Sequence, residues 1–288
     1  MAERIAGGAI STLTIVVITR DHFSFIKECL VSVSNEFSLE TPIIIVDVGS
    51  NDGTRFILED FERHSERDCK ILRIDRNKTP LGAFRALTDF INTDFIAVIS
   101  GDDFFLPGYG SAVRALVESN PPNFVANFSQ LIVDEKSVVI GRREPKWTSN
   151  PQVNRRKLLY SNPGTTAGCL LPWKFVKEVC LKEEYFDTLI EDYYISTRLI
   201  LKIPFKSELQ NLVAYRVHGT NLSKQKMSKK YATSIGICVS LSWHNARNLF
   251  EKILSLTLIA RWGRHVSISR IPQLLAGFVK NNHKGPID

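Results

Sequence analysis

The sequence lacks several patterns that would each place it in another class of protein. Its five cysteines are odd in number and include no Cys-x-x-Cys pair, which argues against both a disulfide framework and a zinc site. No apolar run reaches the ~18–20 residues that a membrane-spanning helix needs. The amino terminus has a short apolar stretch without a basic lead, and this predicts a first strand rather than a signal peptide. These absences predict a cytoplasmic protein with free thiols.

Acidic residues are outnumbered by basic ones, and this imbalance favours anionic partners. The 288-residue chain is 44% hydrophobic and 23% charged, as is ordinary for a globular protein, but its formal net charge is +7. A basic balance favours nucleotides, nucleic acid or a membrane surface without choosing among them. Because no recognised nucleic-acid-binding module appears, we expect no nucleic-acid partner.

Strands and helices alternate in about the first third of the chain. The expected strands are short and apolar, and they lie at 12–19, 42–48, 70–76 and 95–100. Amphipathic stretches between them predict helices at 23–37, 55–63 and 81–92. Repeated strand–helix units predict an α/β fold with a mostly parallel sheet and helices on both faces.

The later part of the chain mixes strands and helices. We expect a hairpin at 125–133 and 138–141, helices at 173–180 and 191–201, and a strand running into a polar loop at 212–223. From about 224 onward helical stretches carry aromatic, apolar and basic residues at helical spacing: Trp243, Phe250, Leu254, Leu258, Trp262, Lys252, Arg261, Arg264 and Arg270. Such a face suits peripheral contact with an anionic membrane, packing on the rest of the chain, or a homo-oligomer, and the sequence leaves these open.

Polar residues cluster where the expected parallel strands end. The clusters lie at 19–21, 47–54 and 101–103. Ligands bind beyond the carboxyl ends of the strands in such sheets, so the three clusters predict one site. Asp102 and Asp103 follow a buried strand directly, and adjacent carboxylates repel each other unless a cation or another partner lies between them.

Six segments, taken in their order and spacing, resemble the inverting family 2 glycosyltransferases, which have the GT-A fold. They are VVITRDHFSFIKECLVSV, IIIVDVGSNDGT, GAFRAL, ISGDDFFLPG, IEDYYISTRL and YRVHGTNLS. The resemblance covers about residues 13–223 and implies a Rossmann-like, mostly parallel sheet flanked by helices, with a helical C-terminal extension. The implied domains are a catalytic domain at 1–223, with a nucleotide-binding half at about 1–108 and an acceptor half at about 109–223, and the extension at 224–288.

For the aspartate pair, the resemblance implies a divalent metal, Mn²⁺ or Mg²⁺, that bridges the diphosphate of a nucleotide-sugar. It assigns Asp103 to the metal and Asp102 to the metal or the ribose, and His218 either completes the coordination or is structural. A hard cation held by oxygen ligands stabilises the charge that the leaving diphosphate gains. Relatives often have an aspartate where this chain has Ser100, so more of the coordination would fall to water and the diphosphate.

The resemblance assigns the nucleotide to residues in several of these segments: Thr19, Arg20, Asp47, Arg85, Asp102 and Arg216. Arg20 stands where several relatives have an aromatic residue over the base; a guanidinium can stack there as well, and a surface arginine is the alternative. Arg85 is either a nucleotide ligand or an ordinary helix-surface charge. Many relatives have an acidic or polar residue after the counterpart of Asp47, whereas this chain has Val48, which leaves the base undetermined.

An inverting transfer is a single displacement and needs one general base. By resemblance to the family's Glu-Asp pair at the start of a helix, Asp192 is the base, and Glu191 positions the acceptor or the base. Favourable interaction of carboxylates with the helix N-terminus is the alternative explanation of this pair. The loop at 161–168 stands where family members line the pocket for the donor sugar and the acceptor.

The predicted protein is therefore a metal-dependent inverting glycosyltransferase of the hexosyltransferase type. It would move a sugar from a nucleotide-diphosphate donor to a hydroxyl of a glycan or lipid-linked acceptor in surface polysaccharide synthesis, in the cytoplasm or at the inner face of the membrane. Two alternatives stay open: a non-catalytic nucleotide- or glycan-binding subunit, and a sugar nucleotidyltransferase. The second is disfavoured because ITRDHFSF lacks the glycine-rich phosphate loop that such enzymes carry after the first strand.

Overall fold

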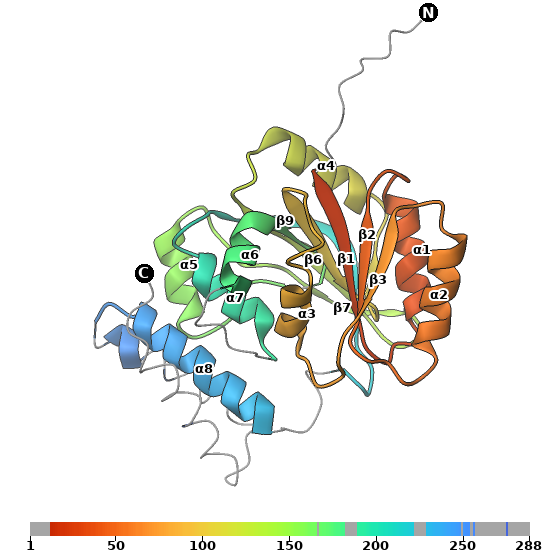
Figure 1. Ribbon diagram of the computed structural model, residues 1–288. Helices are drawn as coiled ribbons and strands as arrows, with labels where there is room; N and C mark the ends of the chain where they lie inside the picture. The colour runs from red at the N-terminus through yellow and green to blue at the C-terminus, as the bar shows by residue number, and fades with distance from the viewer. Residues whose placement is uncertain are drawn as a thin grey trace, which may run out of the picture.

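The computed structural model describes residues 12–165, 167–181, 189–221, 229–248 and 250–253, together with Leu256 and Leu275. Within these residues nine strands form one sheet, and helices cover both of its faces (Figure 1). In the described part of the chain, no helix combines the length and the apolar character that crossing a membrane requires.

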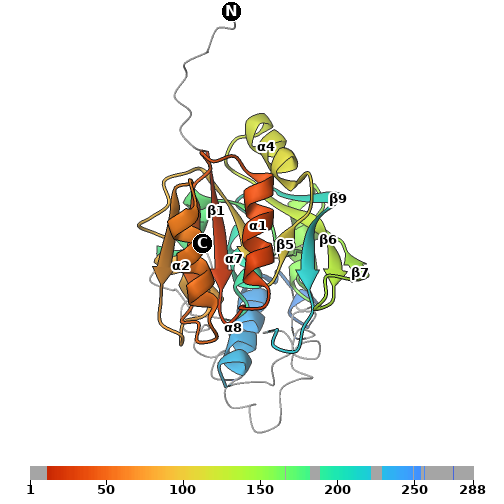
Figure 2. The ribbon, with the colours of Figure 1, turned by 90° about the vertical axis from the view of Figure 1, so that its right-hand side faces the viewer.

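The first half of the sheet is parallel, as the sequence predicts. Its strands are β1 (Leu13–Thr19), β2 (Ile43–Asp47), β3 (Cys69–Arg73) and β4 (Phe95–Ser100), in the spatial order β3-β2-β1-β4. The pairs β1–β2, β1–β4 and β2–β3 are all parallel. The connecting helices are α1 (Ile26–Glu36), α2 (Thr54–His64) and α3 (Pro80–Ala86). Figure 2 shows β1 running away from the amino terminus, so the carboxyl ends of these strands lie at the opposite edge of the sheet.

The second half of the sheet is mixed. Strand β8 (Cys169–Pro172) runs antiparallel between β4 and β6 (Val125–Val133), and β6 pairs in parallel with β9 (Phe205–Arg216). Strand β5 (Phe104–Phe105) pairs with β9, and β7 (Val139–Arg143) forms the predicted hairpin with β6. The remaining helices are α4 (Tyr109–Ser119), α5 (Pro151–Leu158), α6 (Trp173–Leu181), α7 (Glu191–Leu199) and α8 (Lys229–Asn245).

The central strands are buried on both faces because their side chains alternate between two cores. Val16 of β1 belongs to the core that includes residues of α3, α6, α7 and α8, whereas its neighbours Ile15 and Val17 belong to the core under α1, α2 and α4. Strand β4 alternates in the same way. The sequence therefore shows continuous apolar runs here rather than a polar–apolar alternation.

Two helix boundaries differ from those the sequence predicts. Helix α1 begins at Ile26 rather than at 23, because the carbonyl of His22 accepts the N–H groups of both Phe25 and Ile26 and closes a turn before the helix. Helix α3 ends at Ala86 rather than at 92. The carbonyls of its last turn accept hydrogen bonds from backbone N–H groups three residues later in the chain, which is the 3₁₀ pattern. The hydroxyl of Thr88 also donates to the carbonyl of Arg85 at 2.9 Å.

The described part of the C-terminal segment packs on the rest of the chain. Ile235, Val239 and Leu241 of α8 are buried in the core shared with α6 and α7. Beyond α8, the carboxylate of Glu251 accepts two hydrogen bonds, at 2.9 and 2.7 Å, from the buried guanidinium of Arg155 in α5. Several residues of the predicted membrane-facing stripe lie outside the described residues: Leu254, Leu258, Trp262, Arg261, Arg264 and Arg270.

Candidate active site

The strand register brings the predicted polar clusters to one edge of the sheet. Thr19, the last residue of β1, pairs with Asp47, the last residue of β2. On the other side of β1, Ile18 pairs with Ser100, the last residue of β4, two positions before Asp102. Three strands thus end level with one another, and the residues that follow them meet at the same edge.

Asp102 and Asp103 have opposite environments although they are adjacent. One oxygen of Asp102, Oδ2, lies 2.9 Å from His218 Nε2 and 3.3 Å from the amide nitrogen of Asn221, while the buried Oδ1 has no hydrogen-bond partner among the described residues. Burial disfavours ionisation of Asp102, but the hydrogen bond from His218 and the nearby positive charges outweigh it and hold its pKa below the usual range. Asp102 is therefore the ionised member of the pair.

Asp103 is turned away from that cluster and into the protein. Its Oδ1 accepts the backbone N–H of Arg216 at 2.8 Å, and the side chain is buried. Burial, followed by the negative charge of Asp102, raises the pKa of Asp103 well above its usual range. The adjacent carboxyls predicted from the sequence are thus held in different environments, which lower the pKa of Asp102 and raise that of Asp103.

A second imidazole, which the resemblance did not assign, faces Asp102. His22 Nε2 lies 3.7 Å from Asp102 Oδ2, and its other ring nitrogen lies 3.2 Å from the hydroxyl of the buried Thr19. Burial lowers the pKa of His22 against the opposing charge of Asp102. Gly101 makes this arrangement possible, since a Cβ there would lie 2.5 Å from Thr19 Oγ1. His22 could not be recognised as a site residue from the sequence, because its contact with Asp102 joins residues 80 positions apart.

Arg216 is buried beneath the aspartates. Its Nε donates to the carbonyl of Asp102 at 2.9 Å, and the guanidinium stacks between the rings of Phe25 and Phe104. Its terminal nitrogens bond to groups of α1 and of the turn between β6 and β7: Glu28, Asp134, Glu135 and Ser137. The guanidinium therefore holds the aspartate loop, α1 and the hairpin together through protein acceptors.

The part of the site predicted to bind the nucleobase centres on Asp47. This side chain is buried; Oδ1 accepts the backbone N–H of Ser50 at 2.9 Å, and Oδ2 lies 3.4 Å from Arg55 Nε. Arg20 follows β1 and is half-buried. Asp52 and Gly53 form a tight turn directly before α2, with Gly53 at φ +92°.

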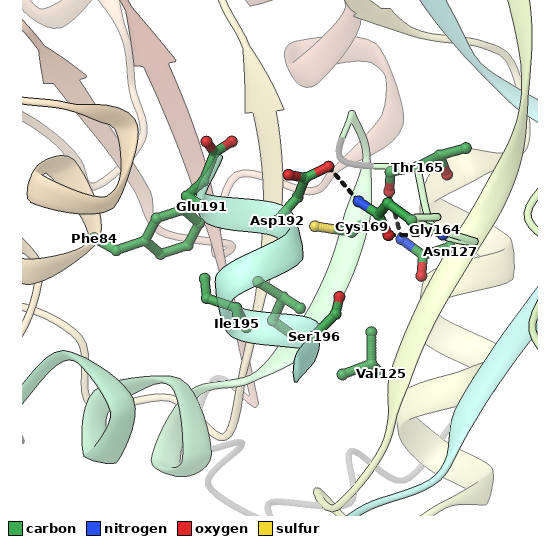
Figure 3. Close-up of a pocket in the computed structure, with 12 residues that line it drawn as sticks. Phe84, Val125, Asn127, Gly164, Thr165, Cys169, Glu191, Asp192, Ile195 and Ser196 are labelled. Atoms are coloured by element: carbon green, nitrogen blue, oxygen red, sulfur yellow. Dashed lines mark hydrogen bonds between the residues drawn. The ribbon is translucent and has the colours of Figure 1, made fainter. Parts of the chain in front are cut away.

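A pocket with about 370 Å³ of empty space, part of it open to solvent, lies beside β4 (Figure 3). Strand β8 joins the pocket to the aspartate cluster, because Cys169 lines the pocket and pairs with Val98 of β4. One part of the wall is apolar, with Phe84, Val125, Cys169, Leu171 and Ile195. The other part carries hydrogen-bonding groups or backbone: Asn127, Asn162, Gly164, Thr165, Glu191, Asp192 and Ser196. Arg85 is exposed on the last turn of α3, one residue after Phe84.

Glu191 and Asp192 both reach the pocket from the start of α7. In Figure 3 Glu191 lies on the side of Phe84, and Asp192 lies on the side of Thr165 and Asn127. Asp192 Oδ2 accepts a hydrogen bond from the amide of Asn162 at 2.6 Å. Burial, followed by the charge of Asp192, raises the pKa of Glu191 to about 8. At neutral pH Glu191 is therefore mostly protonated and can donate a hydrogen bond.

The fold and the two carboxyl pairs together define a glycosyltransferase of the GT-A type. A model of one family, described as Glycosyl transferase family 2, matches residues 14–172, more than half of the chain. The chain therefore belongs to glycosyl transferase family 2. No curated protein matches the sequence.

Several solved structures share the fold at low sequence identity. TarS 1–349 of S. aureus, in complex with UDP-GlcNAc, is 16% identical, with a TM-score of 0.65 over 92% of this chain and 79% of that chain. The mannosyltransferase PcManGT from Pyrobaculum calidifontis, in complex with GDP-Man and Mn²⁺, is 12% identical, with a TM-score of 0.59 over 95% and 76%. GalNAc-T7 with UDP, GalNAc and Mn²⁺ is 12% identical, with a TM-score of 0.60 over 96% and 57%.

Proposed function

We propose that this glycosyltransferase is metal-dependent and inverting, and that it transfers a sugar from a nucleotide-diphosphate donor to a hydroxyl group. The acceptor would be a glycan or a lipid-linked saccharide, and the reaction would serve surface polysaccharide synthesis on the cytoplasmic side. The donor class is supported by three similar folds solved with UDP-GlcNAc, GDP-Man or UDP. The level ends of β1, β2 and β4 support a donor site at this edge of the sheet.

The nucleotide would lie along the residues that follow these strands. Asp47 and Arg20 would contact the nucleobase, and Arg85 would approach the nucleotide from α3. Asp102 would face the diphosphate or its metal. Thr19 would act through His22, because its hydroxyl contacts that ring. Arg216 would support the site from below through its bond to the carbonyl of Asp102.

Asp102 and His218 have the donor atoms that suit a divalent metal. The buried, unpartnered Oδ1 of the ionised Asp102 calls for a cation. His218 Nε2, which lies 2.9 Å from Oδ2 of the same carboxylate, would bind the metal in place of its hydrogen bond to Asp102. Among the described residues, no three His, Cys, Asp or Glu side chains are grouped to hold a metal by themselves, so diphosphate and water oxygens would complete the coordination. When bound, the metal would offset the charge on the leaving diphosphate. The N–H donated by Arg216 favours Asp102 over Asp103 as the ligand.

Asp192 would act as the general base. It would take the proton from the acceptor hydroxyl as the acceptor oxygen bonds to the anomeric carbon. The bond from that carbon to the phosphate oxygen would break in the same displacement, and the electron pair would leave with the nucleoside diphosphate. Glu191, protonated near neutral pH, would donate a hydrogen bond to a sugar hydroxyl and so position it.

The buried, ionised Asp102 with its unpartnered oxygen carries this proposal, and nucleotide binding tests it. We expect isothermal titration with UDP, GDP, dTDP and CDP to give metal-dependent binding of one nucleotide in the presence of Mn²⁺. Asp102→Asn should abolish this dependence, whereas Asp60→Asn, at a side chain that is 71% exposed, should not. A folded protein that binds none of the four, with or without Mn²⁺, would contradict the proposal and favour a non-catalytic subunit.

A further inference from the structure

Asn162 is a neutral side chain that contacts the proposed base. Its Nδ2 donates to Asp192 Oδ2 at 2.6 Å, the bond drawn as a dashed line at Asp192 in Figure 3. Its Oδ1 accepts the backbone N–H of Gly164 at 3.1 Å. The two bonds require the same orientation of the amide, because the flipped orientation would set oxygen against oxygen at Asp192 and N–H against N–H at Gly164.

Hydrogen bonds hold the loop that carries Asn162 to β6 and to the segment before α5. The hydroxyl of Thr165 donates to the carbonyl of Phe128 at 3.1 Å, and the amide of Asn127 donates to the carbonyl of Thr165. Within the loop, the carbonyl of Pro163, the residue after Asn162, accepts the N–H of Lys146 at 2.8 Å. Asn162 is therefore presented to Asp192 from a fixed position.

The start of α7, which carries the base, is fixed separately. The buried hydroxyl of Tyr193 donates to the carbonyl of Leu158 at 2.6 Å. The backbone N–H of Tyr193 donates to the other oxygen of Asp192, Oδ1, at 2.7 Å. With donors on both oxygens, one from the loop and one from α7, the Asp192 carboxylate has one favoured orientation.

We propose that Asn162 is the positioning residue of the general base, orienting the Asp192 carboxylate and keeping it ready to accept the acceptor proton. This inference rests on the proposed function. Asn162 contacts no reacting atom itself: the proton still passes from the acceptor hydroxyl to Asp192. The sequence motif of two adjacent acids does not reveal this partner, which lies 30 positions earlier in the loop between α5 and β8.

The test compares Asn162→Ala with Asn154→Ala. Asn154 has a buried amide that, like that of Asn162, is bonded to its surroundings, here through Thr148, but it does not line the pocket. With UDP-GlcNAc and GDP-Man as probes and Mn²⁺ present, release of nucleoside diphosphate to water or acceptor measures turnover, and titration calorimetry measures nucleotide binding. We expect Asn162→Ala to lower kcat by roughly 10–100-fold, below the full contribution of a general base, with KM for the donor and nucleotide binding unchanged.

A second readout needs no substrate. In protein carrying ¹³C-labelled aspartate carboxyl groups, the signal lost in Asp192→Asn identifies the base. We expect this signal to titrate at higher pH in Asn162→Ala than in the native protein, because the carboxylate loses a donor, and to be unmoved in Asn154→Ala.

Two results would overturn the proposal. One is an unchanged Asp192 titration in Asn162→Ala. The other is a loss of turnover that Asn154→Ala reproduces, which would indicate general destabilisation. If the native protein binds no nucleotide, the proposed function fails, while the carboxyl titration still decides whether Asn162 controls Asp192. The two failures are therefore distinguishable.

Discussion

The molecule contains two pairs of adjacent acids, one at the end of a strand and one at the start of a helix. In each pair one carboxyl has a raised pKa: Asp103 in the first, through burial, and Glu191 in the second, to about 8. The other member accepts a short hydrogen bond from a side chain far away in sequence: Asp102 from His218, and Asp192 from Asn162. The environment thus raises the pKa of one carboxyl in each pair and supplies a side-chain hydrogen bond to the other.

The two pairs differ in what the protonated member can reach. Asp103 is bonded to the backbone of Arg216 and is turned into the protein, so it serves the structure of the loop. Glu191 lines the pocket and is only partly buried, so its proton is available to a substrate. A pair of acids in a sequence therefore does not indicate two equivalent functional groups.

The largest difference is expected within the first pair. Asp102→Asn should abolish metal-dependent nucleotide binding and lower turnover by roughly 10²–10³-fold or more, because the buried negative charge is lost. Asp103→Asn should have a much smaller effect, since the buried Asp103 is bonded to the backbone N–H of Arg216 and is turned away from His218. Calorimetry with and without Mn²⁺ measures both variants. Equal losses would show that the two aspartates share one role.

Variants of the second pair, Glu191 and Asp192, should differ from each other in turnover and not in nucleotide binding. Asp192→Asn should lower kcat by about 10²–10⁴-fold while nucleotide binding is retained, because only proton transfer is lost. Glu191→Gln keeps a hydrogen-bond donor at the same place and should lose far less. Single-turnover assays beside nucleotide titration give both quantities. A Glu191→Gln variant as inactive as Asp192→Asn would reverse the assignment of the base.

The structural role of Arg216, which bonds to the loop of the first pair, can be tested by measuring the free energy of unfolding. Arg216→Met removes a buried cation that bonds to several acceptors, and we expect the free energy of unfolding to fall by roughly 3–5 kcal/mol. Arg73→Met breaks an exposed pair with Glu59 and should cost only about 0–1 kcal/mol. Denaturant titration compares them. A loss of nucleotide binding without loss of stability would instead put the guanidinium of Arg216 on the phosphates.

The last expected effect is a pH dependence of stability from Glu191. Its pKa is about 8 in the folded chain and near 4.5 when unfolded, so between these values the folded state binds more protons. The free energy of unfolding should therefore fall as pH rises through this window, and Glu191→Gln should flatten that slope. Denaturant midpoints measured at several pH values test this. An identical slope in the variant would show that Glu191 is not the group responsible.

Much of the first half of the fold was predictable because its signals are local. The runs ending at Thr19, Asp47 and Ser100 are apolar throughout, which is the pattern of strands buried on both faces. Strand β8 was not predictable, since four residues give no periodicity and its place between β4 and β6 depends on pairing with both. The end of α3 was not predictable either, since it is marked by backbone bonds three residues on and by the hydroxyl of Thr88 bonding to the carbonyl of Arg85.

The sequence by itself determined the parallel half of the sheet, the edge at which the polar clusters meet, and the two pairs of acids. Only the tertiary structure decided which carboxyl of each pair is buried with a raised pKa and which accepts a hydrogen bond from a distant side chain. The chain brings His218 to Asp102 from more than a hundred positions away and Asn162 to Asp192 from thirty positions away. Protonation depends on a residue's surroundings in space, and those surroundings exist only after the chain has folded.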